Sequence, residues 1–152
     1  MRGYFGIGIE NCKTKMNLGT LWRSAHIFGA AFIFVIGRRY EKQGSDTTKA
    51  WRSLPLFNFE NFDQFYGQLP YDCRLVGVEI TERAKPLQTF FHDDRSIYLL
   101  GAEDHGLSKQ ALAKCHRFVQ LPGVFCLNVA VAGSIVMYDR IAKAGIVPLG
   151  KE

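Results

Sequence analysis

The chain has 152 residues, of which 47% are hydrophobic and 22% charged, with a net charge of +5 and a pI near 9.1. This length and composition predict a single folded domain, residues 1–152, and exclude a disordered chain. No apolar run is long enough to cross a bilayer, and the first residues lack the order of a signal peptide, so we expect a cytoplasmic protein without a membrane segment.

Hydrophobic periodicity and turn residues divide the chain into short strands and helices. In the first third we expect a strand over residues 3–9, a polar loop over 10–15, a helix capped by Asn17 and ended by Gly29, a buried strand over 31–36 and a basic loop over 38–52. The middle should contain a short edge strand over 54–57, a brief helix over 61–68, a strand over 75–80 and at most a short helix after Pro86. The last third should contain a strand over 96–100, a helix capped by Ser108 and running through Lys114, a strand over 118–121 and a closing helix over about 127–143.

Strands that alternate with helices predict an α/β fold with a mainly parallel sheet covered by helices on both faces. The closing helix is apolar on nearly every side, and such a helix should be buried. Chain ends usually fray, so a buried helix at this place requires an explanation.

The positive charge is concentrated in the first third of the chain. Residues 1–52 contain nine Lys or Arg against three Asp or Glu, whereas residues 53–152 contain ten against eleven. A basic region of this kind favours a polyanion partner such as nucleic acid, although a generally basic surface gives the same count.

Cysteines and histidines show no ligand spacing. The cysteines at 12, 73, 115 and 126 form no CxxC or Cys/His pattern, and the histidines at 26, 92, 105 and 116 are equally scattered. We therefore expect reduced thiols and no metal site.

Three stretches contain residues suited to chemistry. Residues 17–25 read NLGTLWRSA at the start of a helix, where free N–H groups can bind phosphate, and Arg23 is the unusual polar member of that helix. Residues 99–108 read LLGAEDHGLS, a strand that ends in a glycine-flanked loop at the edge where parallel sheets bind ligands. Residues 121–132 read LPGVFCLNVAVA, a Pro-Gly turn that leads into the closing helix. Taken singly, the first two fit a solvent-reaching arginine and an ordinary strand–helix turn.

Taken in order, the three stretches resemble the three motifs of the SPOUT superfamily of knotted methyltransferases, in its SpoU-like (TrmH-type) branch of RNA ribose 2′-O-methyltransferases. The resemblance covers residues 3–145 or so and is closest to the minimal, single-domain form. It implies S-adenosylmethionine as cofactor and methyl transfer to a ribose 2′-hydroxyl of structured RNA, tRNA more than rRNA.

The resemblance also implies roles for individual residues. The catalytic positions would be Arg23, Asn17 and Asn128. The residues bordering the cofactor would be Val78, Glu79, Gly101, Glu103, Gly106, Leu121, Cys126 and Leu127. Because an arginine is a poor proton acceptor, Arg23 should act by positioning and charge stabilisation. Phosphate contacts are expected from Lys13, Lys15, Arg38, Arg39, Lys49 and Arg52, each of which is equally consistent with solvated surface.

The family fold would explain the apolar closing helix, since its C-terminal segment passes through a loop to form a trefoil knot and packs in a homodimer. Leu127, Val129, Val131, Ile135, Val136 and Ile141 would then be buried.

The sequence departs from the family pattern at the third motif, which leaves two alternatives open. Cys126 stands where serine is usual, Gly123 stands where methionine is usual, and the loop is short. The first alternative is therefore an RNA-binding protein that keeps the fold without methyl transfer. The second, which the Asn17 and Arg23 pair disfavours, is methylation of a base instead of a ribose.

Overall fold

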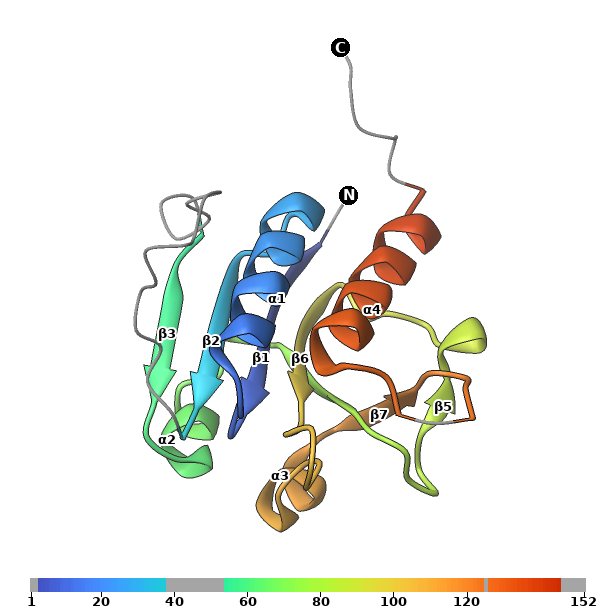
Figure 1. The fold of residues 1–152 in the computed structure, drawn as a ribbon. Helices are drawn as coiled ribbons and strands as arrows, with labels where there is room; N and C mark the ends of the chain where they lie inside the picture. The colour runs from blue at the N-terminus through green and yellow to red at the C-terminus, as the bar shows by residue number, and fades with distance from the viewer. Residues whose placement is uncertain (1–2, 38–53, 125, 146–152) are drawn as a thin grey trace.

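The structure is a computed structural model that describes residues 3–37, 54–124 and 126–145. Within these residues, seven strands form one parallel sheet in the order β3-β2-β1-β6-β4-β7-β5 (Figure 1). The strands are β1 (Tyr4–Glu10), β2 (Phe32–Ile36), β3 (Leu56–Phe59), β4 (Arg74–Val78), β5 (Lys85–Pro86), β6 (Arg95–Leu100) and β7 (Arg117–Gln120). The helices are α1 (Lys15–Phe28), α2 (Phe62–Gly67), α3 (Lys109–Lys114) and α4 (Val129–Lys143), with a 3₁₀ turn, η2 (Leu87–Thr89), after β5. The predicted α/β class is confirmed.

Helices cover both faces of the sheet. α1 and α4 lie side by side over one face, where Leu21 and Met137 are fully buried (Figure 1). α2 and α3 bring Phe65 and Ala111 into a second core on the opposite face. Because burying apolar surface contributes roughly 25 cal/mol per Å², these two cores are the main source of stability.

The glycines of β1 make room for aromatic rings on the neighbouring strand. Gly6 pairs with Phe32 and Gly8 with Phe34 in the parallel register of β1 and β2. A side chain on either glycine would collide with the ring of its partner. The glycine-rich sequence of β1 is therefore compatible with a central strand, because aromatic rings of β2 occupy the space that side chains on Gly6 and Gly8 would take.

The start of α1 differs from the prediction. Thr14, not Asn17, is the N-cap, since its hydroxyl accepts the N–H of Asn17 at 3.3 Å and the helix begins at Lys15. Threonine and asparagine both cap helices well, so the sequence did not distinguish them. As a result, the Asn17 side chain lies within the first turn and bonds elsewhere.

The segment around Pro86 differs in part. The short helix predicted after Pro86 is present as the 3₁₀ turn η2, whereas the two-residue strand β5 before it was not predicted. A strand this short produces no hydrophobic period, so nothing in the pattern revealed it.

Only part of the closing helix is buried within the chain. Val129 and Val136 face the core, whereas Leu127, Val131 and Ile135 are 45%, 44% and 38% exposed. Their burial in a homodimer stays a prediction, as does the trefoil knot. Among the described residues, no helix is long and apolar enough to cross a membrane.

The four cysteine thiols are free, and burial raises the pKa of the Cys115 thiol to about 12. Cys12, Cys73 and Cys115 are buried, whereas Cys126 is exposed. Across residues 3–37, 54–124 and 126–145, no group of three or more His, Cys, Asp and Glu side chains is placed to hold a metal ion.

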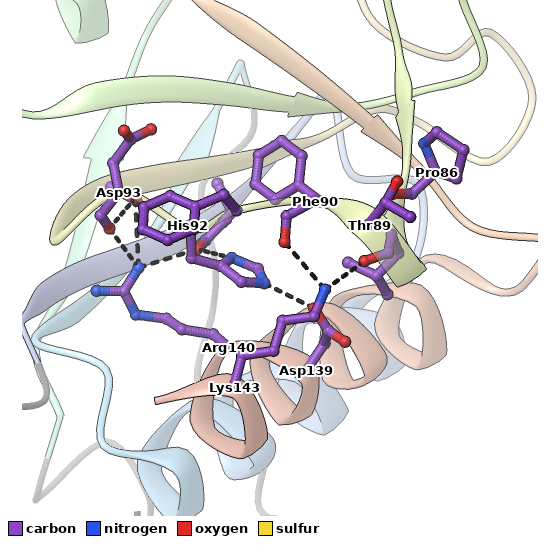
Figure 2. A network of polar contacts seen from close by, with 12 residues as sticks. Pro86, Thr89, Phe90, His92, Asp93, Asp139, Arg140 and Lys143 are labelled. Atoms are coloured by element: carbon purple, nitrogen blue, oxygen red, sulfur yellow. Dashed lines mark hydrogen bonds and ion pairs between the residues drawn. The ribbon is translucent and has the colours of Figure 1, made fainter. Parts of the chain in front are cut away.

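A polar network around the buried Arg140 anchors the C-terminal turns of α4 (Figure 2). Arg140 donates from Nη1 to the carbonyl of Asp93 and from Nη2 to the carbonyl of Asp94, both at 2.8 Å. Lys143 donates from Nζ to the carbonyl of Phe90 at 2.9 Å. These bonds tie α4 to the segment that precedes β6.

His92 lies at the centre of this network. Its Nδ1 is 2.7 Å from the Tyr98 hydroxyl, and its Nε2 is 2.8 Å from Oδ2 of Asp139 (Figure 2). The Tyr98 hydroxyl already accepts from Arg140 at 3.0 Å, so its own hydrogen points to His92 and the neutral ring donates from Nε2 to Asp139. Burial lowers the pKa of His92, and the bond to Asp139 opposes this only in part.

We predict that the free energy of unfolding decreases as the pH falls from about 7.5 to about 5.5. The folded-state pKa of His92 lies below the usual value near 6.5, so the unfolded chain takes up the proton first. The contribution is therefore full above about pH 6.5 and is lost as the pH falls through the folded-state pKa. Urea unfolding at a series of pH values measures this free energy of unfolding.

Two variants should show a weaker dependence of stability on pH than the wild type: His92→Gln, and the double variant that combines His92→Gln with His116→Gln. Burial also lowers the pKa of His116, so this residue acts with the same sign and the double variant should show the flattest profile. A wild-type protein that gained stability on acidification through this window would contradict the assignment.

Candidate functional site

The carboxyl ends of β4, β6 and β7 lie at one edge of the sheet (Figure 1). A cavity of about 350 Å³ opens at this edge. Ligands in parallel α/β sheets bind at this edge, and ligand cavities usually measure about 300–1,000 Å³. Three separate segments line the cavity, namely the end of β4, the loop after β6 and the segment between β7 and α4. The lining includes every residue predicted to border a cofactor: Val78, Glu79, Gly101, Glu103, Gly106, Leu121, Cys126 and Leu127.

The loop after β6 folds back tightly on itself. The N–H of Gly106 donates to the carbonyl of Ala102 at 2.9 Å. Gly106 has a φ of 67°, in the left-handed region, and a side chain on Gly101 would collide with the backbone of Gly106. The turn therefore requires both glycines, and it presents Glu103 at the cavity.

A chain of hydrogen bonds connects the three motifs at the cavity. Oδ1 of Asn128 accepts the N–H groups of Ala130 at 2.9 Å and Val131 at 3.2 Å, and so caps α4. Nδ2 of Asn128 donates to Oδ1 of Asn17 at 2.9 Å. Nδ2 of Asn17 donates in turn to Oε1 of Glu103.

The capping bond fixes the orientation of both amides. A helix N-terminus offers only N–H donors, so Asn128 turns its oxygen to α4 and its nitrogen to Asn17. Asn17 must then turn its nitrogen to Glu103, whose ionised carboxylate can only accept. The two predicted catalytic asparagines thus act together to orient Glu103.

Carboxylates give the cavity a negative charge. Glu79, Glu103 and Asp104 all line it. The pKa of the Asp104 carboxyl is lowered, chiefly by a hydrogen bond that it accepts from its own backbone N–H and further by His105 and by Lys13, whose Nζ lies 3.4 Å away. A lining of this kind favours a ligand that carries positive charge.

Arg23 lies apart from this group. Six residues along an α-helix correspond to about 240° around the axis and about 9 Å of rise, so Arg23 and Asn17 face different directions. Arg23 is exposed and does not line the cavity. The structure therefore brings Asn17, Glu103 and Asn128 together within one chain and leaves Arg23 outside.

The predicted phosphate contacts fall into two groups. Lys13 and Lys15 are exposed at the entry to α1, close to the cavity through the pair of Lys13 with Asp104. Arg38, Arg39, Lys49 and Arg52 lie outside the described residues.

Several lining residues were not predicted from the sequence to border the cofactor. They are Ile80, Leu100, Ala102, Asp104, His105, Gln120, Pro122, Gly123, Val129 and Ala132. Most of them belong to the three motif stretches. Their position near the end of a predicted strand was the feature of the sequence that could have identified them as lining residues. Val129 and Ala132 are three residues apart and share one face of α4.

Comparisons with known proteins agree with this geometry. A profile of the SpoU rRNA Methylase family matches residues 5–138. A tRNA/rRNA methyltransferase described as uncharacterized, from Archaeoglobus fulgidus, is 28% identical over 148 residues, which is 90% of this chain and 63% of that protein. The chain spans less than two thirds of the length of the curated relatives it matches.

Solved structures share the fold. The SpoU methyltransferase AviRb from Streptomyces viridochromogenes, in complex with the cofactor AdoMet, has a TM-score of 0.79 at 22% identity, covering 93% of this chain and 58% of that chain. A structure described as giving insight into the 2-OH methylation of C/U34 on tRNA has a TM-score of 0.81 at 19% identity, covering 95% of this chain and 99% of that chain.

Two substitutions should separate the two hydrogen-bonding roles of Asn128. Asn128→Ser keeps a capping oxygen but loses the amide that reaches Asn17, whereas Asn128→Ala loses both. We predict that the alanine variant is less stable than the serine variant by about 1 kcal/mol. Urea unfolding measures the difference, and equal stability of the two variants would show that the side chain does not cap α4.

Proposed function

The chain belongs to the SpoU rRNA Methylase family, and from this membership we propose that it transfers the methyl group of S-adenosylmethionine to a ribose 2′-hydroxyl of structured RNA, with tRNA favoured over rRNA. One observation carries the proposal. Three segments far apart in the sequence line one cavity, and Glu103 in that lining accepts a hydrogen bond from Asn17, which in turn accepts one from Asn128. The AdoMet complex of AviRb and the tRNA 2-OH methylation structure support it through their shared fold.

The lining of the cavity fits this cofactor. Val78, Leu121 and Leu127 offer apolar surface for the adenine ring. Glu103 and Asp104 place negative charge where a sulfonium ion would be stabilised. When bound, S-adenosylmethionine supplies an electrophilic methyl group.

Residues of the chain contribute mainly by orientation. Asn128 and Asn17 hold Glu103 in one position before any ligand arrives, so its charge need not be reoriented during the reaction. Fixed geometry between two reactants can lower a barrier by several kcal/mol, roughly 7–11 in the best cases. A ribose hydroxyl bound beside Glu103 would therefore find the carboxylate already oriented by Asn17 and Asn128.

We further propose that a second copy of the chain completes the site. Apolar side chains of α1 and α4 are exposed, namely Met16, Ile27, Val131, Ile135 and Tyr138. An apolar face of this kind is typical of an interface between copies. Residues 16, 20, 23 and 27 share one face of α1, so Arg23 would lie in this interface and act at the partner's cavity.

Basic side chains near the cavity are suited to the RNA backbone. Lys13 and Lys15 are exposed beside the cavity, and Arg23 would add a positive charge from the partner. Contacts to phosphates would make RNA affinity fall steeply as salt rises.

Cys126 is the observation that favours the alternative, an RNA-binding protein without transfer activity. Its thiol lies in the cavity where the family usually has a hydroxyl, and a thiol is a weaker hydrogen-bond donor. The alternative predicts RNA binding without measurable binding of S-adenosylmethionine.

We predict that Arg23→Ala abolishes methyl transfer while cofactor affinity stays within about twofold of wild type, because Arg23 does not line the cavity. Titration calorimetry measures affinity, and a labelled methyl group measures transfer. Loss of both together would mean that Arg23 supports the fold, and absence of binding by the wild type would favour the non-enzymatic alternative.

Mixing two inactive variants tests where Arg23 acts. If Arg23 serves the partner's cavity, Arg23→Ala mixed one to one with Glu103→Gln forms heterodimers with one intact site. Roughly a quarter of wild-type activity should then return. No recovery, with subunit exchange confirmed, would place Arg23 at its own chain's site.

A further inference from the structure

Glu10 is a buried carboxylate that neither the motifs nor the cavity lining accounts for. It ends β1 and is 2% exposed. Its position in the sequence suggested the first residue of a polar loop, yet a charge this deeply buried is costly unless it is fully hydrogen-bonded. The hydrogen bonds that compensate this cost therefore identify the part of the structure that Glu10 holds in place.

Both oxygens of Glu10 bind one residue, Ser108. Oε1 accepts the N–H of Ser108 at 2.8 Å, and Oε2 accepts its hydroxyl hydrogen at 2.7 Å. The Ser108 hydroxyl also accepts the N–H of Ala111 at 3.1 Å and so caps α3. Glu10 thus fixes the point where the loop after β6 ends and α3 begins.

A second carboxylate holds the same loop from the opposite side. Oε2 of Glu79 accepts the N–H of Leu107 at 3.0 Å. β6 lies between β1 and β4 in the sheet, so Glu10 and Glu79 approach its loop from the two flanking strands and bind consecutive residues. The base of the loop is clamped on both sides.

This clamp also connects the loop to α1. β1 continues through residues 11–14 directly into α1, whose first turn carries Asn17. Asn17 binds Glu103 near the tip of the loop that Glu10 holds at its base. Glu10 therefore sets the separation between two segments that must meet at the cavity.

We infer that Glu10 is a positioning residue for the proposed cofactor site, acting through Ser108 to hold residues 101–108 in the conformation that binds S-adenosylmethionine. The inference rests on the proposed function. The role is specific for a carboxylate, because one group must accept both an N–H and an O–H from the same residue. Glutamine has the same shape but offers only one acceptor oxygen, so the hydroxyl hydrogen of Ser108 would lose its acceptor.

The test is a double-mutant cycle on cofactor affinity. Titration calorimetry with S-adenosylmethionine compares the wild type with Glu10→Gln, Ser108→Ala and the double variant. Each single variant should raise the Kd by roughly tenfold, since misplacement of supporting groups typically weakens a site by 10- to 100-fold. The double variant should be no worse than Ser108→Ala, because both changes remove the same hydroxyl contact and only Ser108→Ala also removes the cap of α3.

The matched control is Glu60→Gln, an exposed carboxylate after β3 that should leave the Kd unchanged. A readout independent of cofactor is amide hydrogen exchange, where Leu107 and Ser108 should lose at least tenfold protection in Glu10→Gln. Tyr98, inside β6, should keep its protection. Loss at Tyr98 as well would indicate general destabilisation and overturn the positioning role.

The outcomes separate this inference from the proposed function. Wild-type affinity in folded Glu10→Gln and Ser108→Ala overturns the inference alone, as does a double variant whose losses add. If Glu10→Gln does not fold, Ser108→Ala decides by the same criterion. A wild type that does not bind S-adenosylmethionine overturns the proposed function, and the inference falls with it.

Discussion

The side-chain amide of Asn128 joins the fold to the candidate site. Its oxygen caps the fifteen-residue helix α4, and its nitrogen holds Asn17, which holds Glu103. The cap fixes which end of the amide faces the cavity, so the electrostatic arrangement of the site follows from the need to satisfy a helix N-terminus. An aspartate could cap α4 as well but has no donor to offer Asn17, and a serine would lack the amide that reaches Asn17.

The parallel sheet determines which segments can meet. Strands β4, β6 and β7 end at the same edge, so three segments distant in sequence line one cavity, and β1 next to β6 leads to Asn17, which binds Glu103 in that lining. The buried carboxylate of Glu10 and the carboxylate of Glu79 hold the loop after β6 from either side. At the opposite end of α4, the network of His92, Asp139 and Arg140 fixes the helix to the segment before β6.

Periodicity located all four α-helices and six of the seven strands among the described residues, because these elements carry apolar faces. It missed β5, whose two residues carry no pattern. Strand order depends on contacts distant in sequence, so the sequence alone did not place β6 between β1 and β4. The same limit applies to Glu10, whose burial depends on Ser108, 98 residues away. Eight of the lining residues were predicted through the resemblance to the family, whereas the position of Arg23 outside the cavity required the structure.

The central claim is methyl transfer to a ribose hydroxyl, and the position of the transferred methyl group tests it directly. The purified protein is incubated with bulk tRNA or, separately, with rRNA, in the presence of S-adenosylmethionine carrying a labelled methyl group, and the RNA is then hydrolysed in alkali. A 2′-O-methyl group blocks cleavage at its own phosphodiester, so the label should appear in alkali-resistant dinucleotides. Label in mononucleotides would show base methylation, and unlabelled RNA of both classes, tRNA and rRNA, would contradict the transferase assignment.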